Sequence, residues 1–314
     1  MEKPAQFRLK ASELMPLSVK SDFSGVMRAL GHFGAMAIAG TALWNSIGTC
    51  WAIPLTAITG YLIAFLFTTE HEMAHQTAFK TRTLNYICGH FAGFAILLPY
   101  EYYRAYHWDH HRYTQDPAKD PELAVPLPTT RFGLVFFWSG IPTWIDRVRM
   151  LLVHGVKGKV TKPWVPENKR GLIAREARFY LLGYLTIIVV SIATRSPAAL
   201  LLWVVPVVVG QWFLRPYLLA EHTGCEHGPN MLANTRTTYT NALIRFFAWN
   251  MPYHVEHHAY PVVPFHALPK LNAILATHIT NTEKGYPAST VSVLRYIKHE
   301  IRGEPVSRPQ PTDS

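Results

Sequence analysis

A chain of 314 residues with 49% hydrophobic and only 16% charged residues departs from soluble domains, in which roughly 25% of residues are charged. Its net charge of +10 does not indicate a nucleic-acid partner, because Lys and Arg are confined to particular segments. None lies between Arg28 and Lys80, and only Arg195 lies between Arg178 and Arg215. This distribution is typical of a membrane protein whose basic loops face the cytoplasm and an anionic membrane surface.

The three cysteines are widely spaced and form no Cys-x-x-Cys, which excludes a thiolate zinc module or an iron–sulfur cluster. The first 21 residues are polar and basic and lead to no small-residue cleavage site, so we expect no signal peptide. No linker, low-complexity tract or repeat divides the chain. We therefore predict one integral-membrane domain over residues 1–314.

The first third of the chain predicts a transmembrane hairpin. Residues 1–22 are expected to be a cytoplasmic lead-in. The apolar runs 23–47 and 51–68 are each close to the roughly 20 residues that cross a bilayer. The turn between them has no Lys or Arg and is expected outside. The hairpin, residues 23–69, thus returns the chain to the cytoplasmic side.

The remaining segments repeat this organisation. Residues 84–99 are apolar but too short to span, so we expect an interfacial or re-entrant helix there. They belong to a predicted cytoplasmic cap, residues 70–178, with an interfacial aromatic patch at 132–144. A second hairpin over 179–220 and a cytoplasmic tail over 221–314 follow. The sequence predicts an all-α membrane protein with about four transmembrane helices, interfacial helices, a cytoplasmic histidine-rich cap and both termini cytoplasmic.

Three histidine boxes lie in polar sequence, one at His-x-x-x-His and two at His-x-x-His-His spacing. On a helix, positions three and four apart share a face, so each box can direct all its rings to a common point. A further histidine ends the last apolar run, where an ionisable group indicates function. Nine imidazoles exceed the four to six or so ligands of one ion and suit two ions, without selecting the metal. The candidate ligands are His71, His75, His107, His110, His111, His222, His254, His257 and His258.

Carboxylates accompany these histidines along the chain. With nine imidazoles available, we expect the carboxylates to accept ring N–H donors and to orient the ligands. For Asp120, which precedes a proline, ordinary turn chemistry is an equal alternative. The predicted orienting residues are Glu72, Asp109, Glu221, Glu256 and Asp120.

The three ordered boxes, with the isolated histidine after the fourth apolar run, resemble the membrane fatty acid desaturase family from about residue 50 to residue 270. The stretches HHRYTQDPAKDPE and NMPYHVEHHAYPVVPFHALPKL are similar to that family as well. The resemblance implies two non-haem iron ions held by the nine histidines. It also implies O₂ as co-substrate, two external electrons and abstraction of hydrogens from a fatty acyl or lipid-like chain.

Details of the boxes place the resemblance in one part of the family. Box one has three intervening residues, as in the acyl-lipid and sphingolipid branches, whereas the acyl-CoA Δ9 branch has four. Leu218 occupies the position of an asparagine of that branch, and His254 opens box three where front-end desaturases have glutamine. No His-Pro-Gly-Gly of a fused cytochrome b5 occurs. The resemblance therefore implies a separate electron donor, a ferredoxin or cytochrome b5 with its reductase.

Three other functions stay open at this point. The same oxidant could hydroxylate a lipid or small molecule instead of desaturating it. His71-Glu72-x-x-His75 is also the signature of a zinc protease, with Glu72 as general base, although it leaves seven histidines unexplained. A metal transporter would need its histidines along a path at the bilayer midplane, whereas these boxes follow the apolar runs.

Overall fold

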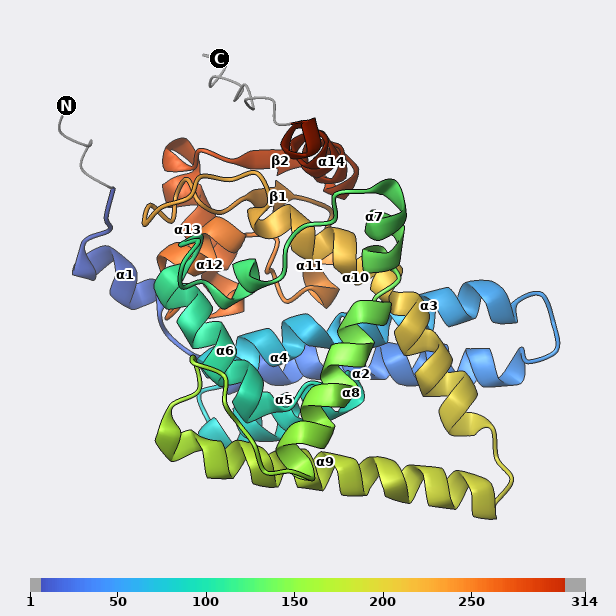
Figure 1. The fold of residues 1–314 in the computed structure, drawn as a ribbon. Coiled ribbons are helices and arrows are strands. Elements are labelled where there is room, and N and C mark those ends of the chain that lie inside the picture. Colours follow the sequence, from blue (N-terminus) through green and yellow to red (C-terminus); the bar gives the residue numbers. More distant parts are fainter. Residues whose placement is uncertain (1–6, 303–314) are drawn as a thin grey trace.

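The structure, a computed structural model, describes residues 7–302 and is built mainly from helices (Figure 1). Two short strands, β1 (Thr237–Tyr239) and β2 (Thr282–Lys284), pair in parallel. The α-helices are α1 (Ala11–Leu17), α2 (Asp22–Asn45), α3 (Ala52–Ala64), α4 (Leu66–His75), α5 (Arg82–Ala95), α6 (Tyr100–Tyr113), α7 (Arg131–Trp138), α8 (Ile141–Gly155), α9 (Glu167–Ala193), α10 (Val205–His222), α11 (Ala242–Phe247), α12 (His254–Ala259), α13 (Leu268–Leu275) and α14 (Tyr286–Arg302). A π-helical segment, Leu200–Val204, leads into α10.

Among the described residues, four helical segments are long and apolar enough to cross a membrane. α3 and α4 together form one of them, and the π-helical segment with α10 forms another. The prediction of an all-α membrane protein with about four transmembrane helices is confirmed. The four segments are Asp22–Asn45, Ala52–His75, Glu167–Ala193 and Leu200–His222.

Two of these segments are longer than the apolar runs in the sequence. The second continues to His75, so box one lies on the same helical segment as the apolar run. α9 begins at Glu167, directly after Pro166, whereas the apolar run begins only at Phe179. The added residues include Glu, Lys, Arg and Ala, which favour helix, but the charged ones make this stretch too polar for a bilayer. Hydropathy marks the membrane-crossing part of a helix and does not mark the helix ends.

Close packing of small residues joins the two hairpins. α3 and α10 form the most extensive helix pair among the described elements. Gly60 of α3 faces Gly210 of α10, and a Cβ atom added to Gly210 would lie 2.1 Å from the carbonyl oxygen of Gly60. Such small-residue contacts let helix backbones approach closely in a bilayer.

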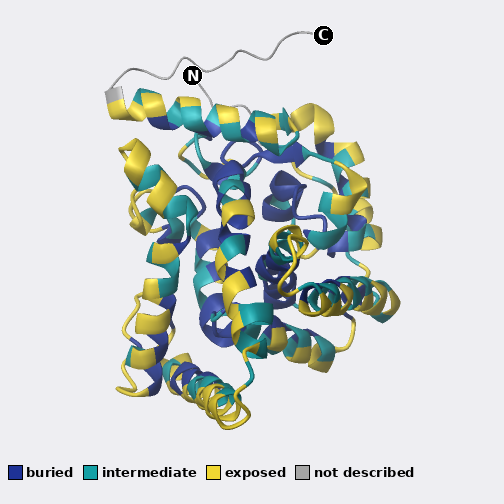
Figure 2. Ribbon diagram, turned by 90° about the vertical axis from the view of Figure 1, so that its right-hand side faces the viewer, coloured by how far each residue is buried: buried dark blue, intermediate teal, exposed yellow. Residues whose placement is uncertain are grey.

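The spanning helices expose apolar side chains, as expected for contact with lipid (Figure 2). α9 is the clearest case. Its exposed side chains include Phe179, Leu182, Leu185, Ile188 and Ile192. Buried residues concentrate instead in a core to which α4, α6, α10 and α13 contribute, and which includes Met73, Tyr100, Trp249 and Phe265.

The remaining described helices are shorter than the four spans. α5 packs against α4 and is only 14 residues long, in agreement with the expected non-crossing helix. α14 packs against α10. Residues 1–6 of the predicted lead-in and 303–314 of the predicted tail lie outside the described residues.

Candidate metal centre

Four helices bring the nine predicted histidines together. α4 carries box one, α6 carries box two, α12 carries box three, and α10 ends at His222. The chain leaves α4 directly after His75 because Gln76 adopts the left-handed conformation, with φ of 56°. All nine side chains are buried, none being more than 7% exposed.

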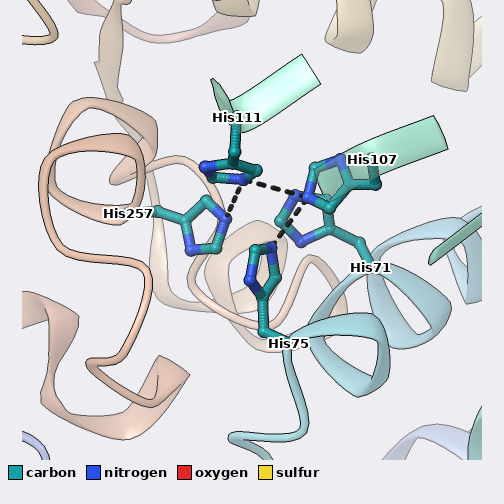
Figure 3. Close-up of side chains that lie close together, drawn as sticks. All are labelled: His71, His75, His107, His111 and His257. Atoms are coloured by element: carbon teal, nitrogen blue, oxygen red, sulfur yellow. Dashed lines mark hydrogen bonds between the residues drawn. The ribbon is translucent and has the colours of Figure 1, made fainter. Parts of the chain in front are cut away.

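Five of the nine form one group, whose donor atoms all lie within 4.8 Å of one another (Figure 3). The Nε2 atom of His107 lies 2.8 Å from that of His75 and 3.0 Å from that of His111. The Nε2 atom of His257 lies 3.1 Å from that of His111. The ring of His71 lies 4.2 Å from the ring of His107, measured between centroids. We call His71, His75, His107, His111 and His257 the five-histidine group.

Three others, His110, His222 and His258, form a second group with the same 4.8 Å limit. We call it the three-histidine group. His254 lies beside it, since its Nε2 atom is 3.1 Å from the Nε2 atom of His222. The rings of His111 and His258 stack at 4.1 Å and connect the two groups.

The sequence predicted that each box would aim all its rings at one point, and the structure differs. Box two divides between the groups, with His107 and His111 in the first and His110 in the second. Box three divides in the same way between His257 and His258. Successive residues on a helix are rotated by about 100°, so side chains at adjacent positions cannot share one direction.

The nitrogen spacing fits metal binding. Two imidazole nitrogens about 2.1 Å from one ion and at right angles to each other lie roughly 3.0 Å apart. The Nε2–Nε2 distances in the five-histidine group are 2.8, 3.0 and 3.1 Å. Several buried ring nitrogens also have no hydrogen-bond partner, including both nitrogens of His71 and the Nε2 atom of His258. Buried nitrogen atoms without a hydrogen-bond partner are consistent with binding of a metal ion.

The electrostatics keep most of these rings neutral. Burial, together with the neighbouring imidazoles, holds the pKa of His107, His111, His254, His257 and His258 well below its usual value. A neutral imidazole has a free lone pair at neutral pH and can bind a metal without first losing a proton.

His110 is the exception among the six histidines of α6 and α12. Burial lowers its pKa, but the carboxylates of Glu122 and Asp120 outweigh burial, and the pKa of His110 is raised. Its Nδ1 atom lies 2.9 Å from Oδ1 of Asp120. Burial raises the pKa of Asp120, but the contact with His110 and two backbone N–H groups outweigh it, and this pKa is lowered. Asp120 therefore both orients an imidazole and caps a turn.

The other four predicted carboxylates lie differently. The nearest to a histidine is Glu221, whose Oε1 atom is 3.6 Å from Nδ1 of His254. The side chain of Asp109 points to Arg112, 3.4 Å away. The distance from Glu221 is too long for a strong hydrogen bond, and Asp109 contacts an arginine instead of an imidazole.

Glu72 and Glu256 make their hydrogen bonds with groups outside the histidine boxes. Oε1 of Glu72 accepts from the Thr77 hydroxyl at 2.7 Å and from the backbone N–H of Phe265 at 3.1 Å. Oε2 of Glu256 accepts from the Thr237 hydroxyl at 2.6 Å. Glu72 thus ties box one to the segment after box three, which does not favour a role as the base of a zinc protease.

Two histidine contacts have little or no signal in the sequence. The hydroxyl of Thr114 lies 3.2 Å from Nδ1 of His258, and the backbone carbonyl of Asn234 lies 3.3 Å from Nδ1 of His222. Thr114 is one turn after His110 and could have been suspected on that ground. A backbone carbonyl brought in from a loop leaves no signal in residue type.

Comparison with known proteins gives a consistent result. The family described as fatty acid desaturase matches residues 26–287. A dihydrorhizobitoxine desaturase of Bradyrhizobium elkanii is 28% identical over 76% of this chain and 71% of its own length. A chloroplastic omega-6 fatty acid desaturase of Spinacia oleracea is 25% identical over 79% of this chain and 56% of its own length. A sphingolipid delta(4)-desaturase of Homo sapiens is 27% identical over 82% of this chain and 74% of its own length.

Proposed function

The chain belongs to the fatty acid desaturase family, and on that premise we propose that this oxidoreductase inserts a double bond into a fatty acyl or sphingolipid-like chain with O₂ as oxidant. The balanced reaction converts CH₂–CH₂, O₂, two electrons and two protons into CH=CH and two water molecules. The relatives are named for desaturation of fatty acids, of sphingolipids and of dihydrorhizobitoxine, so an aliphatic chain is the proposed substrate class.

One observation carries the proposal of a two-metal oxidising centre. Eight of the nine predicted ligands lie in two adjacent groups with donor atoms within 4.8 Å, and the ninth contacts the second group. We propose that each group, with His254 in the second, holds one iron ion. Non-haem iron bound there would supply the oxidising power, drawn from O₂ and two electrons, to remove hydrogen from an unactivated C–C unit.

The protein's own part is to hold the imidazoles and to exclude water. Three of the four helices that carry the ligands, α4, α10 and α6, are also parts of the buried core. Burial keeps most rings neutral, and Asp120 fixes the direction of His110. A rigid, dry set of ligands lowers the reorganisation needed during the reaction.

We further propose that the metal centre and both termini lie on the cytoplasmic side. The described turns that connect the spans at residues 46–51 and 194–199 contain one basic residue between them, Arg195. Residues 157–178, before the apolar part of α9, contain seven Lys or Arg. Basic residues are retained on the cytoplasmic side of membranes. The electrons would then come from a cytoplasmic ferredoxin or cytochrome b5 with its reductase.

Lipid profiling of a host that expresses the protein tests the function. We expect a new lipid lighter than its precursor by two hydrogen atoms, formed only with O₂ present. A product heavier by one oxygen atom would show that the protein hydroxylates its substrate instead of desaturating it. Product formation under strict anaerobiosis, or no new lipid at all in hosts that supply both kinds of carrier, would contradict the proposal.

Asp120→Asn tests the part played by the carboxylate at His110. The amide is neutral and of the same size, so its oxygen accepts the Nδ1–H of His110 and the Glu122 N–H more weakly. Its NH₂ group cannot accept from the Gln115 N–H, so one contact of the turn is lost as well. Loss of such a contact costs about 10- to 100-fold in metal affinity. We expect that loss for one iron ion only, measured by titration of the iron-free protein.

Asp116→Asn is the matched control, because Asp116 lies in the same loop and contacts the Ala118 backbone instead of a histidine. Its iron affinity should equal that of the unmodified protein. Equal affinity in Asp120→Asn would show that the carboxylate serves the turn alone.

A further inference from the structure

One aromatic side chain connects the protein surface with the five-histidine group. Trp108 lies on α6 between His107 and Asp109 and is 41% exposed. Its ring centroid nevertheless lies 5.0 Å from that of His75 and 6.3 Å from that of His111. A half-exposed indole in contact with two candidate ligands is a short path between solvent and the proposed iron.

Trp108 lines a surface hollow of about 200 Å³ between α6 and the start of α9. Other lining residues are Glu101, Arg104, Arg112, Trp164 and Lys169. The acidic side chains here already have basic partners. Glu101 lies 3.2 Å from Arg104 and 3.8 Å from Lys169, measured from carboxylate oxygen to nitrogen. Their charge is therefore largely compensated within the hollow.

Basic side chains outnumber acidic ones in the lining of the hollow, which includes Arg104, Arg112 and Lys169. The segment that supplies Trp164 and Lys169, residues 157–178, contains seven Lys or Arg and two Glu. One of the two, Glu176, is buried and accepts from the Glu101 backbone N–H at 3.0 Å, so it contributes little at the surface. Lys162 is exposed, and its Nζ atom lies 5.1 Å from the centre of the Trp164 ring that lines the hollow. The surface around Trp108 therefore carries an excess of basic side chains, and the hollow itself is lined by the rings of Trp108 and Trp164.

We propose that an acidic one-electron carrier protein docks on this hollow and that electrons pass through Trp108 to the five-histidine group. The inference rests on the proposed function, which needs two electrons for each double bond. Two reduced carriers would supply them in turn, each losing one electron, while O₂ is reduced to water with two protons from solvent and two hydrogens from the substrate.

A protein carrier fits the hollow better than an anionic membrane surface does. Opposite charge steers two proteins together and speeds their association, and electron-transfer complexes use small interfaces that separate quickly. A flat bilayer surface cannot enter a recess, so phospholipid head groups would contact only its edge. An acidic protein protrusion can reach the Trp108 ring between the basic side chains.

Stopped-flow reoxidation of a reduced carrier tests both parts of the proposal. The iron-loaded full-length protein is mixed with a reduced plant-type ferredoxin or a reduced cytochrome b5 over a range of carrier concentrations. Trp108→Leu should lower the limiting rate by an order of magnitude or more at unchanged iron content and unchanged half-saturating carrier concentration. Trp108→Phe retains an aromatic ring and should keep most of the rate.

The double variant Lys162→Glu with Lys169→Gln tests docking separately. Glutamine is used at residue 169 because a second acid there would face Glu101, 3.8 Å away. We expect association to slow about tenfold and to depend less on salt, with the limiting rate unchanged. Lys298→Glu is the matched control, since it reverses an exposed charge on α14, away from the hollow.

Several outcomes would overturn the proposal. The path through Trp108 is refuted by an unchanged limiting rate in Trp108→Leu, by a lower rate that is accompanied by loss of iron, or by a Trp108→Phe variant as slow as Trp108→Leu. Docking on the hollow is refuted if Lys298→Glu slows association as much as the double variant does. A double variant that binds anionic phospholipid vesicles less well, with no change toward either carrier, would assign the surface to lipid instead. Electron uptake is measured without substrate and does not depend on double-bond formation. A protein that accepts electrons in this assay but forms no double bond in lipid profiling would refute the proposed function and leave the docking site standing.

Discussion

Replacing His257 by alanine is expected to abolish double-bond formation while the protein stays folded. Its Nε2 atom lies 3.1 Å from that of His111, and its ring lies 4.6 Å from that of His71 and 4.5 Å from that of His75. No other group from α12 belongs to the five-histidine group, so the variant loses the whole contribution of box three to that group. We expect bound iron to fall from about two ions to about one per chain.

His222→Ala should give the complementary result, because His222 belongs only to the three-histidine group. About one iron ion per chain should again remain, held this time by the five-histidine group. The measurements are iron content by elemental analysis, desaturated lipid by mass spectrometry and the apparent melting temperature in detergent. Full activity in either variant, or two retained iron ions, would contradict the assignment of ligands.

His266→Ala is the matched control for both variants. His266 follows box three closely and packs against the Phe265 ring at 5.5 Å, but it is in neither histidine group. Iron content and activity should stay close to those of the unmodified protein. Equal loss in this variant would mean that packing of the segment, and not ligand removal, explains the effect of His257→Ala.

The clustering of the histidines was predictable because its signals are local. Spacings of three and four on a helix place His71 with His75 and His107 with His111, whatever the rest of the fold does. The four apolar runs likewise follow from composition. The division of boxes two and three between two groups was not predictable, since it depends on how α4, α6 and α12 are turned toward one another.

The carboxylates show where residue type stops being informative. Asp120, which could equally have been a turn residue, both contacts His110 and caps a turn. Glu72 stands inside box one, yet its hydrogen bonds run to Thr77 and to the Phe265 backbone. Adjacent positions on a helix face different sides, so nearness in sequence to a histidine says little about contact with its ring.

Gly210→Ala is expected to destabilise the packing of the two hairpins. The added Cβ would lie 2.1 Å from the carbonyl oxygen of Gly60 and 2.7 Å from Cβ of Ala64. A backbone oxygen cannot move aside as a flexible side chain can, so α3 and α10 must separate along their contact. Overpacking costs up to about 3 kcal/mol, and this variant should lie at that end of the range. The apparent melting temperature in detergent should fall by several degrees.

Gly40→Ala is the matched control, since it adds the same methyl group to a spanning helix where nothing lies within 4 Å. Alanine favours helix over glycine by up to about 1 kcal/mol, so this variant should be as stable as the unmodified protein or slightly more stable. The two substitutions therefore have opposite expected signs. A Gly210→Ala variant that melts no lower than Gly40→Ala would contradict the close approach of α3 and α10.

Gly60→Ala, alone and combined with Gly210→Ala, decides whether the contact between the helices causes the loss of stability. A Cβ on Gly60 would lie 2.4 Å from the carbonyl oxygen of Pro206, so the single variant should be destabilised as well. Once one methyl group has pushed the helices apart, the second meets less resistance, and the loss in the double variant should be smaller than the sum of the two single losses. Strictly additive losses would instead indicate that each glycine acts within its own helix.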